Sequence, residues 1–489
     1  MVHRSNKELL LNDIACTLES ILTAEAAQQS ETARCLLEAE QDAPINTASF
    51  DDDSDDDIDI EMECSASYAV MQLYIQLLNS RYTFDRVQGW SRPEKMYTLL
   101  QHFAPTNTRS YRGLVRMTPE AFDKLTLKLQ QTAAFGQGYM DINRVREIAA
   151  VAFYQLGRFG NGASERDVAL QCGCSIGSLI GWTDKTVKGL LEMSKEIMAF
   201  ASKGERAAVS AWVRQRSGVP EWGQGWLVVD GTHIQLAFKL AMMEKEHRNY
   251  KSFHSLNVAL VIMPHSLRIV ESVVGQPGSV QDSKVWTSGS NILKKPRLYL
   301  DEGEFIWVDG GYGHSTFTVG PFSHVHADKS KDLKHFNYSL SRVRVRVEHV
   351  IAYLKNRFMC LKGYRGNIYR VKDQATAAKV IQACIIAHTF ASRYDRDDDL
   401  FALLQPTYSE DEIQEIIDSM RECRDSNRET RRTRRAAQRQ YEHDLAEATA
   451  GMSQTAISRM RIDGAHELCE QMFQVLFRST AQVEEDTSP

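Results

Sequence analysis

The sequence predicts an α/β protein in which one mixed sheet is flanked by helices, with a helical region before the sheet and a charged helical extension after it. Short β-rich runs begin at Trp222, among them WLVVDGTHIQLAF, SLNVALVIMP and FIWVDG, and Gly, Pro and Ser residues separate them. Apolar residues recur at helical spacing on both sides of that segment. These two sequence patterns predict a sheet domain at 222–392 between helical segments at 66–215 and 393–489.

Composition places the chain among ordinary globular proteins. It has 489 residues, of which 43% are hydrophobic and 25% are charged, so it has room for two or three domains. Its nine cysteines are scattered and form no repeated pair that would complete a zinc site, so we expect reduced thiols in an intracellular protein. No apolar run approaches the roughly 18 residues that cross a bilayer, so we expect no membrane segment.

Charge is strongly segregated along the chain, although the formal net charge is only -6. Residues 51–63, DDDSDDDIDIEME, carry nine acids and no base, which predicts an acidic, largely disordered region at 1–65. Residues 342–372 carry nine Lys and Arg residues against the single acid Glu348. A basic segment at 342–372, separate from the acidic N-terminal run, is compatible with a nucleic-acid partner.

Within the helical segment, residues 163–191 have the spacing of a helix-turn-helix. Gly173 would make the turn, and Ser175 would cap the second helix. The outward face of that helix would then carry four residues able to meet DNA: Ser178, Thr183, Lys185 and Lys188. A purely structural helical hairpin is an equally good interpretation of the pattern.

Two strands of the predicted sheet each end in an aspartate. The first ends at Asp230, and two further strands reach Met263 and Val274 in hairpin-like succession. A crossover helix at 281–293 then leads to a fourth strand that ends at Asp309. In a β-β-β-α-β unit of the ribonuclease-H type the fourth strand lies parallel beside the first, so we expect Asp230 and Asp309 to be neighbours at the sheet edge.

Neighbouring carboxylates repel each other unless a cation lies between them. A hard divalent ion such as Mg²⁺ prefers one or two protein carboxylates together with phosphate and water. Gly231, Gly310 and Gly311 follow the two aspartates and would let the backbone turn away. Asp282 is an alternative second ligand, although N-capping of the crossover helix explains it slightly better.

A third carboxylate is expected from SRVRVRVEHVIAYLKNRF, residues 341–358, which supplies Glu348 on a predicted helix. Two metal ions held by these carboxylates would activate the attacking oxygen and stabilise the leaving oxygen in phosphodiester cleavage. The basic residues of the same helix would bind the DNA backbone: Arg342, Arg344, Arg346, Lys355 and Arg357. Three histidines, His233, His254 and His349, are not spaced as in a metal-binding motif, so they are better explained as structural or substrate-facing residues.

Four motifs in this order, VVDGTHI, GSVQDSKVW, WVDGGYG and VEHVIAYLKNRF, resemble the DDE endonuclease domain of PIF/Harbinger-type transposases and the Harbinger-derived nuclease family. The resemblance covers about residues 140–392. It implies a ribonuclease-H-like core, Mg²⁺ or Mn²⁺, and DNA cleavage or strand transfer in the nucleus, with Asp230, Asp309 and Glu348 as the catalytic and metal-binding triad. It also implies a Myb-like DNA-binding partner. Gln281 stands where many relatives have His, and Ala352 and Tyr353 replace an aromatic-Gly pair.

The main alternative to a nuclease is a domesticated DNA-binding or scaffold protein whose fold persists without catalysis. Retention of all three carboxylates favours the nuclease. Outside the resemblance, RETRRTRRAAQRQ at 428–440 is interpreted as a nuclear-localisation segment rather than a DNA contact. The DNA site and the oligomeric state stay open, and a homo-oligomer is one alternative.

Overall fold

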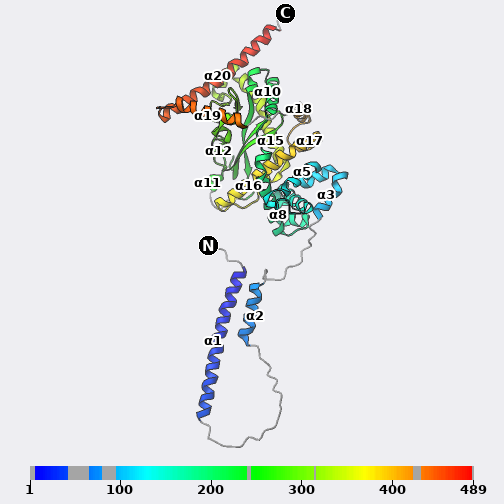
Figure 1. The fold of residues 1–489 in the computed structure, drawn as a ribbon, viewed down its shortest axis with the longest axis vertical. Coiled ribbons are helices and arrows are strands. Elements are labelled where there is room, and N and C mark those ends of the chain that lie inside the picture. Colours follow the sequence, from blue (N-terminus) through cyan, green and yellow to red (C-terminus); the bar gives the residue numbers. More distant parts are fainter. Residues whose placement is uncertain are drawn as a thin grey trace. The chain divides into compact units, whose positions relative to one another are not determined.

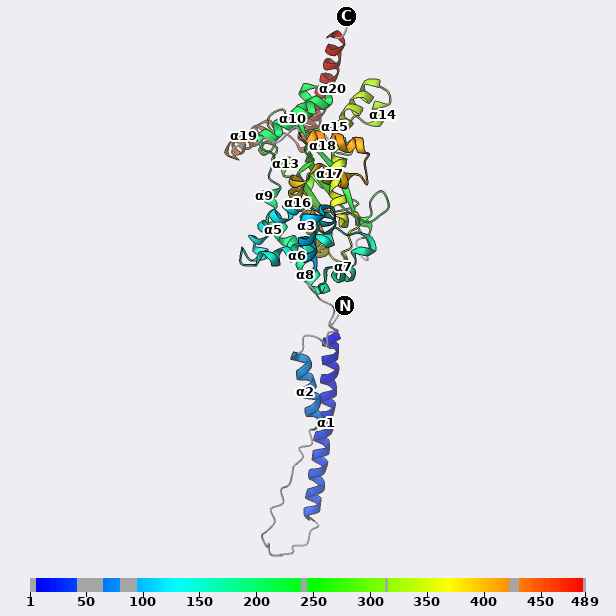
Figure 2. The same ribbon diagram turned by 90° about the vertical axis from the view of Figure 1, so that its right-hand side faces the viewer.

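The computed structural model describes residues 6–41, 65–79, 95–238, 244–312, 315–421 and 431–486. The chain divides into two units, Met1–Gly89 and Trp90–Pro489. In the first unit, α1 (Asn6–Gln41) and α2 (Ala66–Asn79) pack side by side (Figures 1 and 2). The acidic run at 51–63 lies outside the described residues. No helix among the described segments is long and apolar enough to cross a membrane.

The second unit begins with a group of helices whose ends carry strong local signals. Thr118 accepts a hydrogen bond from the Ala121 N–H and Pro119 is the first helical residue, a combination that starts α5. Asp141 caps α6 by accepting from two backbone N–H groups. The helices are α3 (Lys95–Thr106), α4 (Thr108–Val115), α5 (Pro119–Gln130), α6 (Ile142–Leu156), α7 (Glu165–Cys172), α8 (Ile176–Glu192), α9 (Ser194–Ile197) and α10 (Lys203–Ser217).

A mixed five-stranded sheet follows, in the order β3-β2-β1-β4-β5. Its strands are β1 (Gly225–Gln235), β2 (Ser255–Met263), β3 (Arg268–Pro277), β4 (Phe305–Trp307) and β5 (Thr318–Val319). β1 is antiparallel to β2 and parallel to β4, so the fourth strand lies beside the first as expected. The sequence did not predict β5, because a strand of two residues carries no periodic signal.

β1 is longer than predicted and does not end at Asp230. It continues through Gly231 to Gln235, and this second half stays paired with β2. Thr232 and Ile234 are buried in it, so the alternation of a strand persists beyond the aspartate. Its pairing with β4 stops earlier, at Val228. The prediction ended the strand at Asp230 because a Gly directly after an aspartate is typical of a turn.

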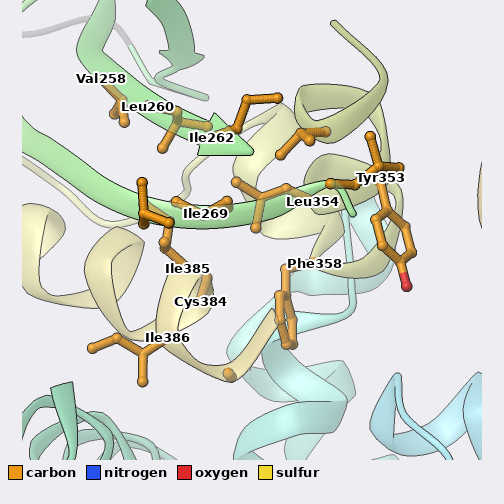
Figure 3. Close-up of a cluster of buried hydrophobic side chains, with 14 of the residues drawn as sticks. Val258, Leu260, Ile262, Ile269, Tyr353, Leu354, Phe358, Cys384, Ile385 and Ile386 are labelled. Carbon is orange, nitrogen blue, oxygen red and sulfur yellow. The ribbon is translucent and has the colours of Figure 1, made fainter. Parts of the chain in front are cut away.

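Helices cover the sheet on both faces. α12 (Asp282–Gly289) contacts β1, β2 and β3, and α15 (Lys331–Arg357) with α16 (Val371–Ala391) contacts the same strands. Val258, Leu260 and Ile262 of β2 join Leu354, Phe358 and Ile385 in one buried cluster (Figure 3). The remaining helices are α11 (Glu244–His247), α13 (Asn291–Lys294), α14 (His324–Ala327), α17 (Asp397–Leu404), α18 (Glu410–Arg421), α19 (Arg431–Ala448) and α20 (Gln454–Asp486).

The C-terminal helices pack against the body of the second unit. The Trp222 indole N–H donates to the Met472 carbonyl of α20 at 3.1 Å. The Phe473 ring packs against Phe322 and Phe336. In α19, Arg434 donates to the carbonyls of Leu298 and Tyr299, both at 3.0 Å. The extension therefore contributes to the core, and the boundaries near 215 and 393 within this unit stay predictions.

Candidate functional site

The parallel register of β1 and β4 brings Asp230 and Asp309 together. Val228 of β1 is the partner of Trp307, the last residue of β4. Asp230 lies two residues further along β1, and Asp309 lies two residues beyond the end of β4. Continuing the register therefore places Asp230 opposite Asp309. The chain turns at Gly310 and Gly311, directly after Asp309. The two carboxylates lie where β4 has ended and β1 continues.

The pleat of β1 determines which helix each of its side chains faces. Asp230 pairs with Leu260, so both side chains lie on the same face of the sheet. Leu260 belongs to the cluster with Leu354 of α15 (Figure 3). Asp230 is therefore directed to the face that α15 covers, and the next residue, Gly231, is directed to the face that α12 covers.

Asp282 reaches the site from that opposite face. A Cβ built on Gly231 would lie 2.4 Å from the Asp282 carboxyl carbon, so only glycine leaves room for this carboxylate. The Asn257 amide donates to Asp282 Oδ1 at 2.5 Å and to the Val280 carbonyl at 2.9 Å. The N-cap residue of α12 is Gln281 and Asp282 is already helical, so the N-capping explanation was wrong.

Tyr312 is a site residue that the sequence reasoning missed. Its side chain is buried, and its ring lies edge-on against Trp286 at 5.7 Å between centroids. Within the part of the chain that the structure describes, its hydroxyl has no hydrogen-bond partner. Burial, followed by the charges of Asp230, Asp282 and Asp309, raises the pKa of Tyr312. The hydroxyl is thus a spare donor close to three carboxylates, and only the WVDGGYG motif could have pointed to it.

Burial raises the pKa of Asp230 from 3.8 to about 6, and the charges of Asp309 and Asp282 act in the same direction. The Arg344 guanidinium and the Gly231 N–H oppose this shift. Arg344 of α15 donates to Asp309 Oδ1 at 2.8 Å, and its side chain is only 15% exposed. A fixed cation therefore already balances part of the negative charge.

Replacing Asp230 with Asn is expected to stabilise the metal-free protein. The folded-state pKa of about 6 lies above the ordinary value of 3.8, so the stability of the parent falls as the pH rises from about 4 to 6. Above pH 6 the carboxylate costs on the order of 2 to 3 kcal/mol, and the neutral amide avoids that cost. Urea unfolding in EDTA should show Asp230→Asn more stable than the parent at pH 7.5 and equal to it at pH 4.

The control for that measurement is Glu302→Gln, which removes a charge from an exposed residue. It should leave stability within about 0.5 kcal/mol at both pH values. If Asp230→Asn shows no pH-dependent advantage over this control, burial does not disfavour the Asp230 charge.

The Glu348 carboxylate does not lie with those of Asp230 and Asp309 in this structure. Its side chain is exposed, and it is not among the charges that shift the pKa of Asp230. It does lie on the same stripe of α15 as Arg344 and Lys355, because residues 344, 348, 351 and 355 recur at helical spacing. Arg344 reaches Asp309, and Lys355 donates to the His233 carbonyl at 2.9 Å. Glu348 therefore lies between two side chains that border the site.

The donor set suits a hard divalent cation, although the ligands are not gathered around one point. The carboxylates of Asp230, Asp282 and Asp309 offer oxygen ligands, and the unpartnered Tyr312 hydroxyl could donate to a bound water. Among the described residues, no three His, Cys, Asp or Glu side chains are close enough to hold a metal ion. Two of the carboxylates already have other partners, since Arg344 is bonded to Asp309 and Asn257 is bonded to Asp282.

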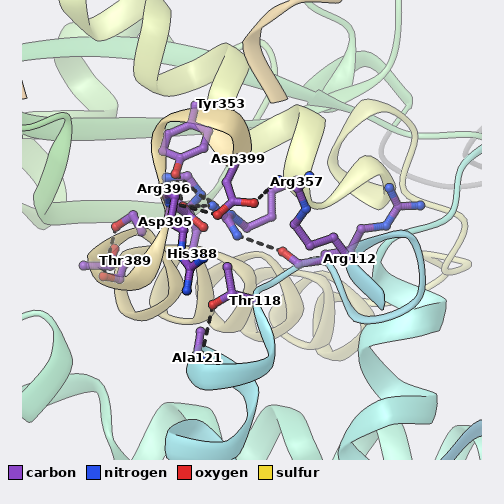
Figure 4. A network of polar contacts seen from close by, with 12 residues as sticks. Arg112, Thr118, Ala121, Tyr353, Arg357, His388, Thr389, Asp395, Arg396 and Asp399 are labelled. Atoms are coloured by element: carbon purple, nitrogen blue, oxygen red, sulfur yellow. Dashed lines mark hydrogen bonds and ion pairs between the residues drawn. The ribbon is translucent and has the colours of Figure 1, made fainter. Parts of the chain in front are cut away.

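Two of the five predicted DNA contacts on α15 are structural residues. Arg357 is fully buried and donates to the Tyr353 hydroxyl and to the Arg116 carbonyl, and it forms an ion pair with Asp395 (Figure 4). Arg346 is 2% exposed and lies over the Trp212 ring. Neither can reach a phosphate, because helical periodicity turns both toward neighbouring elements.

The remaining three α15 residues keep a place at or near the surface. Arg342 is exposed, whereas Arg344 and Lys355 are partly buried at the carboxylate site. Of the three histidines, His233 lies at the site with its Nδ1 3.1 Å from the Ser255 hydroxyl. His349 is buried against the Tyr408 ring, and the His254 ring nitrogen lies 3.6 Å from Glu244.

The helical hairpin of α7 and α8 forms at the predicted residues. Gly173 has a positive φ of 70°, and the Ser175 side chain accepts from the Ser178 N–H. Thr183 is not on the outward face, because its hydroxyl donates to the Gln155 amide of α6. Lys188 is exposed but pairs with Asp184 at 2.6 Å.

The rest of that outward face is less polar than predicted. Ile176 is 43% exposed and Ile180 is 49% exposed. Lys185 is partly buried near the Phe135 ring, and the Ser178 hydroxyl lies 2.9 Å from that of Ser175. DNA contact by this hairpin stays a prediction.

Comparison with known proteins identifies one similarity. Residues 229–388 match the family model for the DDE superfamily endonuclease. The matched segment contains Asp230, Asp282, Asp309 and Glu348, and it spans β1 through most of α16. Comparisons with curated proteins and with solved structures gave no match. This segment therefore resembles a DDE nuclease domain.

Proposed function

We propose that this protein is a divalent-metal-dependent DNA nuclease of the transposase type, related to the PIF/Harbinger group and built on a ribonuclease-H-like core. The observation that carries the proposal is that Asp230 and Asp309 follow the last paired residues of β1 and β4 and act on each other electrostatically, inside a segment that resembles DDE endonucleases. The strand order, with β4 parallel beside β1 and β2 antiparallel to it, supports the same core.

Asp230, Asp309 and Glu348 would hold the ions, with Asp282 as an additional carboxylate at the Asp230 side. When bound, divalent ions stabilise the charge that develops on the attacking and leaving oxygens of a phosphodiester. Arg344 orients Asp309 through its bond to Oδ1 and lies where it can also donate to a phosphate oxygen. The Tyr312 hydroxyl, held by Trp286, can donate to a carboxylate or to a water between the carboxylates.

Assembly of this site requires a local rearrangement. Glu348 must turn from its exposed position toward the aspartates, and Arg344 must share Asp309 with a cation. Glu348 and Arg344 lie one turn apart on the same stripe of α15, so both side chains face the same neighbouring elements. DNA phosphate is a natural partner for the guanidinium that Asp309 releases.

A second candidate function is DNA binding or scaffolding without catalysis. It is favoured by one observation, that the described residues contain no group of three metal-holding side chains. We rank it below the nuclease because Asp230, Asp309 and Glu348 are all retained and a bound cation would offset the cost of burying the Asp230 charge.

The deciding experiment is nicking of supercoiled plasmid by the purified full-length protein with Mg²⁺ or Mn²⁺, and with EDTA as the matched control. We expect nicking that depends on the metal and falls as salt rises, because phosphate contacts weaken with ionic strength. DNA binding without nicking under any metal condition would support the second candidate.

We also propose that the protein acts in the nucleus and, as the family resemblance implies, with a Myb-like DNA-binding partner. A homo-oligomer is compatible with this proposal. The arginine segment at 428–440 is in part docked, since Arg434 is bonded to the carbonyls of Leu298 and Tyr299. A fluorescent fusion that stays outside the nucleus would contradict the localisation.

A further inference from the structure

Three lysines gather beside the carboxylate site, and the sequence reasoning identified only one of them. They come from separate elements: Lys251 follows α11, Lys355 is on α15, and Lys362 ends the short helix η5 (Met359–Lys362). Burial, followed by the charges of Lys362 and Lys251, lowers the pKa of Lys355 to about 8. Among the described residues, no ion pair with an acid neutralises any of the three.

His233 connects these lysines to the carboxylates. Burial lowers its pKa, and the charges of Asp282, Lys355 and Lys251 act on the same ring. The Lys355 ammonium also donates to the His233 carbonyl. The charges of Asp282 and of two of the lysines therefore act on the same imidazole ring. Lysines that form no ion pair among the described residues suit the phosphates of a nucleic-acid backbone.

Beyond Lys362 the chain runs along the end of β1 to a cavity. The Tyr364 N–H donates to the Gln235 carbonyl, and the Ala237 N–H donates to the Tyr364 carbonyl, both at 2.8 Å. Beside this pairing lies a cavity of about 370 Å³ between the helical region and the sheet domain. The residues that line the cavity include Gln155, Arg158, Phe238, Tyr364, Arg365 and Asn367.

The lining combines the groups that recognise a nucleobase and its phosphate. Phe238 is 44% exposed, and the Arg365 guanidinium lies 5.2 Å from its ring centre. Aromatic and guanidinium planes stack on bases of any sequence. The Gln155 amide oxygen already accepts from Thr183, so Gln155 can offer its amide N–H groups to a base edge, and Asn367 can offer its amide. The volume lies at the small end of the range for ligand pockets, which suits a single nucleotide rather than a duplex.

We propose that this cavity takes one unpaired nucleotide of the DNA substrate, and that Lys251, Lys355 and Lys362 hold the phosphates between the cavity and the carboxylates. The inference rests on the proposed function and specifies its substrate as DNA with a flipped or unpaired base. Asp230 lies on β1 and Leu236 directly follows its end, six residue steps further along extended backbone, which corresponds to about 20 Å. That distance spans about six base steps of a duplex.

The test compares two short duplexes of equal length, one fully paired and one with a single bulged 2-aminopurine, in EDTA so that cleavage is prevented. Fluorescence anisotropy measures affinity, and 2-aminopurine emission reports the stacking of the bulged base. We expect the bulged duplex to bind about tenfold more tightly, because stacking of one base contributes an effect of this order. The emission should change on binding.

Phe238→Ala and Arg365→Gln should each remove that preference while paired-duplex affinity is kept. Tyr369→Ala is the matched control, because Tyr369 is an exposed aromatic residue in the loop of Arg365 that does not line the cavity. Lys362→Gln should weaken both duplexes alike and reduce the salt dependence by about one phosphate contact. Thermal unfolding of each variant shows that the fold is retained.

The outcomes separate this inference from the proposed function. Equal affinity for the two duplexes, with unchanged emission, would overturn the nucleotide cavity even if metal-dependent nicking is observed. Loss of preference in Tyr369→Ala to the same extent as in Phe238→Ala would also overturn it. A folded parent that binds neither duplex and nicks no plasmid would contradict both.

Discussion

Asp230→Asn and Asp309→Asn should each reduce metal-dependent plasmid nicking by about a thousandfold. Each change removes a charged ligand from a pair that meets in one register, and loss of several kcal/mol of charge stabilisation corresponds to a factor of this size. Glu348→Gln should have an effect of the same order, because α15 covers the face to which Asp230 points. Initial nicking rates at pH 7.5 with saturating Mn²⁺ measure this.

Mn²⁺ binding measured by calorimetry supplies a readout independent of activity. Asp230→Asn and Asp309→Asn should weaken it, and the exposed control Glu302→Gln should not. Asp282→Asn distinguishes the third ligand: if it removes nicking and metal binding while Glu348→Gln retains both, the third carboxylate comes from α12 and not from α15. Full activity in all four variants would rule out this carboxylate site.

Arg357→Ala should destabilise the protein by about 3 to 5 kcal/mol. Arg357 and Asp395 are both almost completely buried, and removing one partner leaves the other charge without compensation. The guanidinium also bonds the Tyr353 hydroxyl at 2.8 Å and the Arg116 carbonyl at 2.7 Å, so it joins α15 to the helical region (Figure 4). Chemical unfolding monitored by tryptophan fluorescence measures the change.

Arg342→Ala is the matched control, because it removes the same side chain from an exposed position of the same helix. Its stability should stay within about 0.5 kcal/mol of the parent, and only its DNA affinity should fall. Replacing Arg357 and Asp395 together should cost less than the sum of the two single changes. If Arg357→Ala is as stable as Arg342→Ala and loses DNA affinity instead, Arg357 is a DNA contact after all.

The arrangement of the sheet was predictable because its signals are local. β-rich runs with Gly and Pro between them identified four strands and the crossover helix, and the parallel pairing of β1 with β4 followed from their order. The same reasoning ended β1 at Asp230, because a Gly after an aspartate is typical of a turn. Gly231 is instead a strand residue whose missing side chain makes room for Asp282.

Local patterns could not assign the basic residues of α15. Arg342, Arg344 and Arg346 alternate in the sequence, yet one is exposed, one bonds Asp309 and one is buried against Trp212. Their environments depend on which distant elements pack on each face of the helix. Tyr312 was missed because a lone tyrosine in a loop carries no periodic signal, and its burial against Trp286 depends on packing between distant segments.

By itself the sequence determined that Asp230 and Asp309 lie on or directly after two neighbouring parallel strands, because strand runs and their order follow from residues close together in the chain. Tertiary structure alone decided which charges meet. Asp282 approaches Gly231, which lies 51 residues earlier in the chain. Arg357 contacts Asp395 and Arg116, which belong to two other parts of the fold. The charges of Lys251 and Lys362 act on Lys355 beside the site. Electrostatic partners are set by distance in space, which only the packing of the helices on the sheet determines.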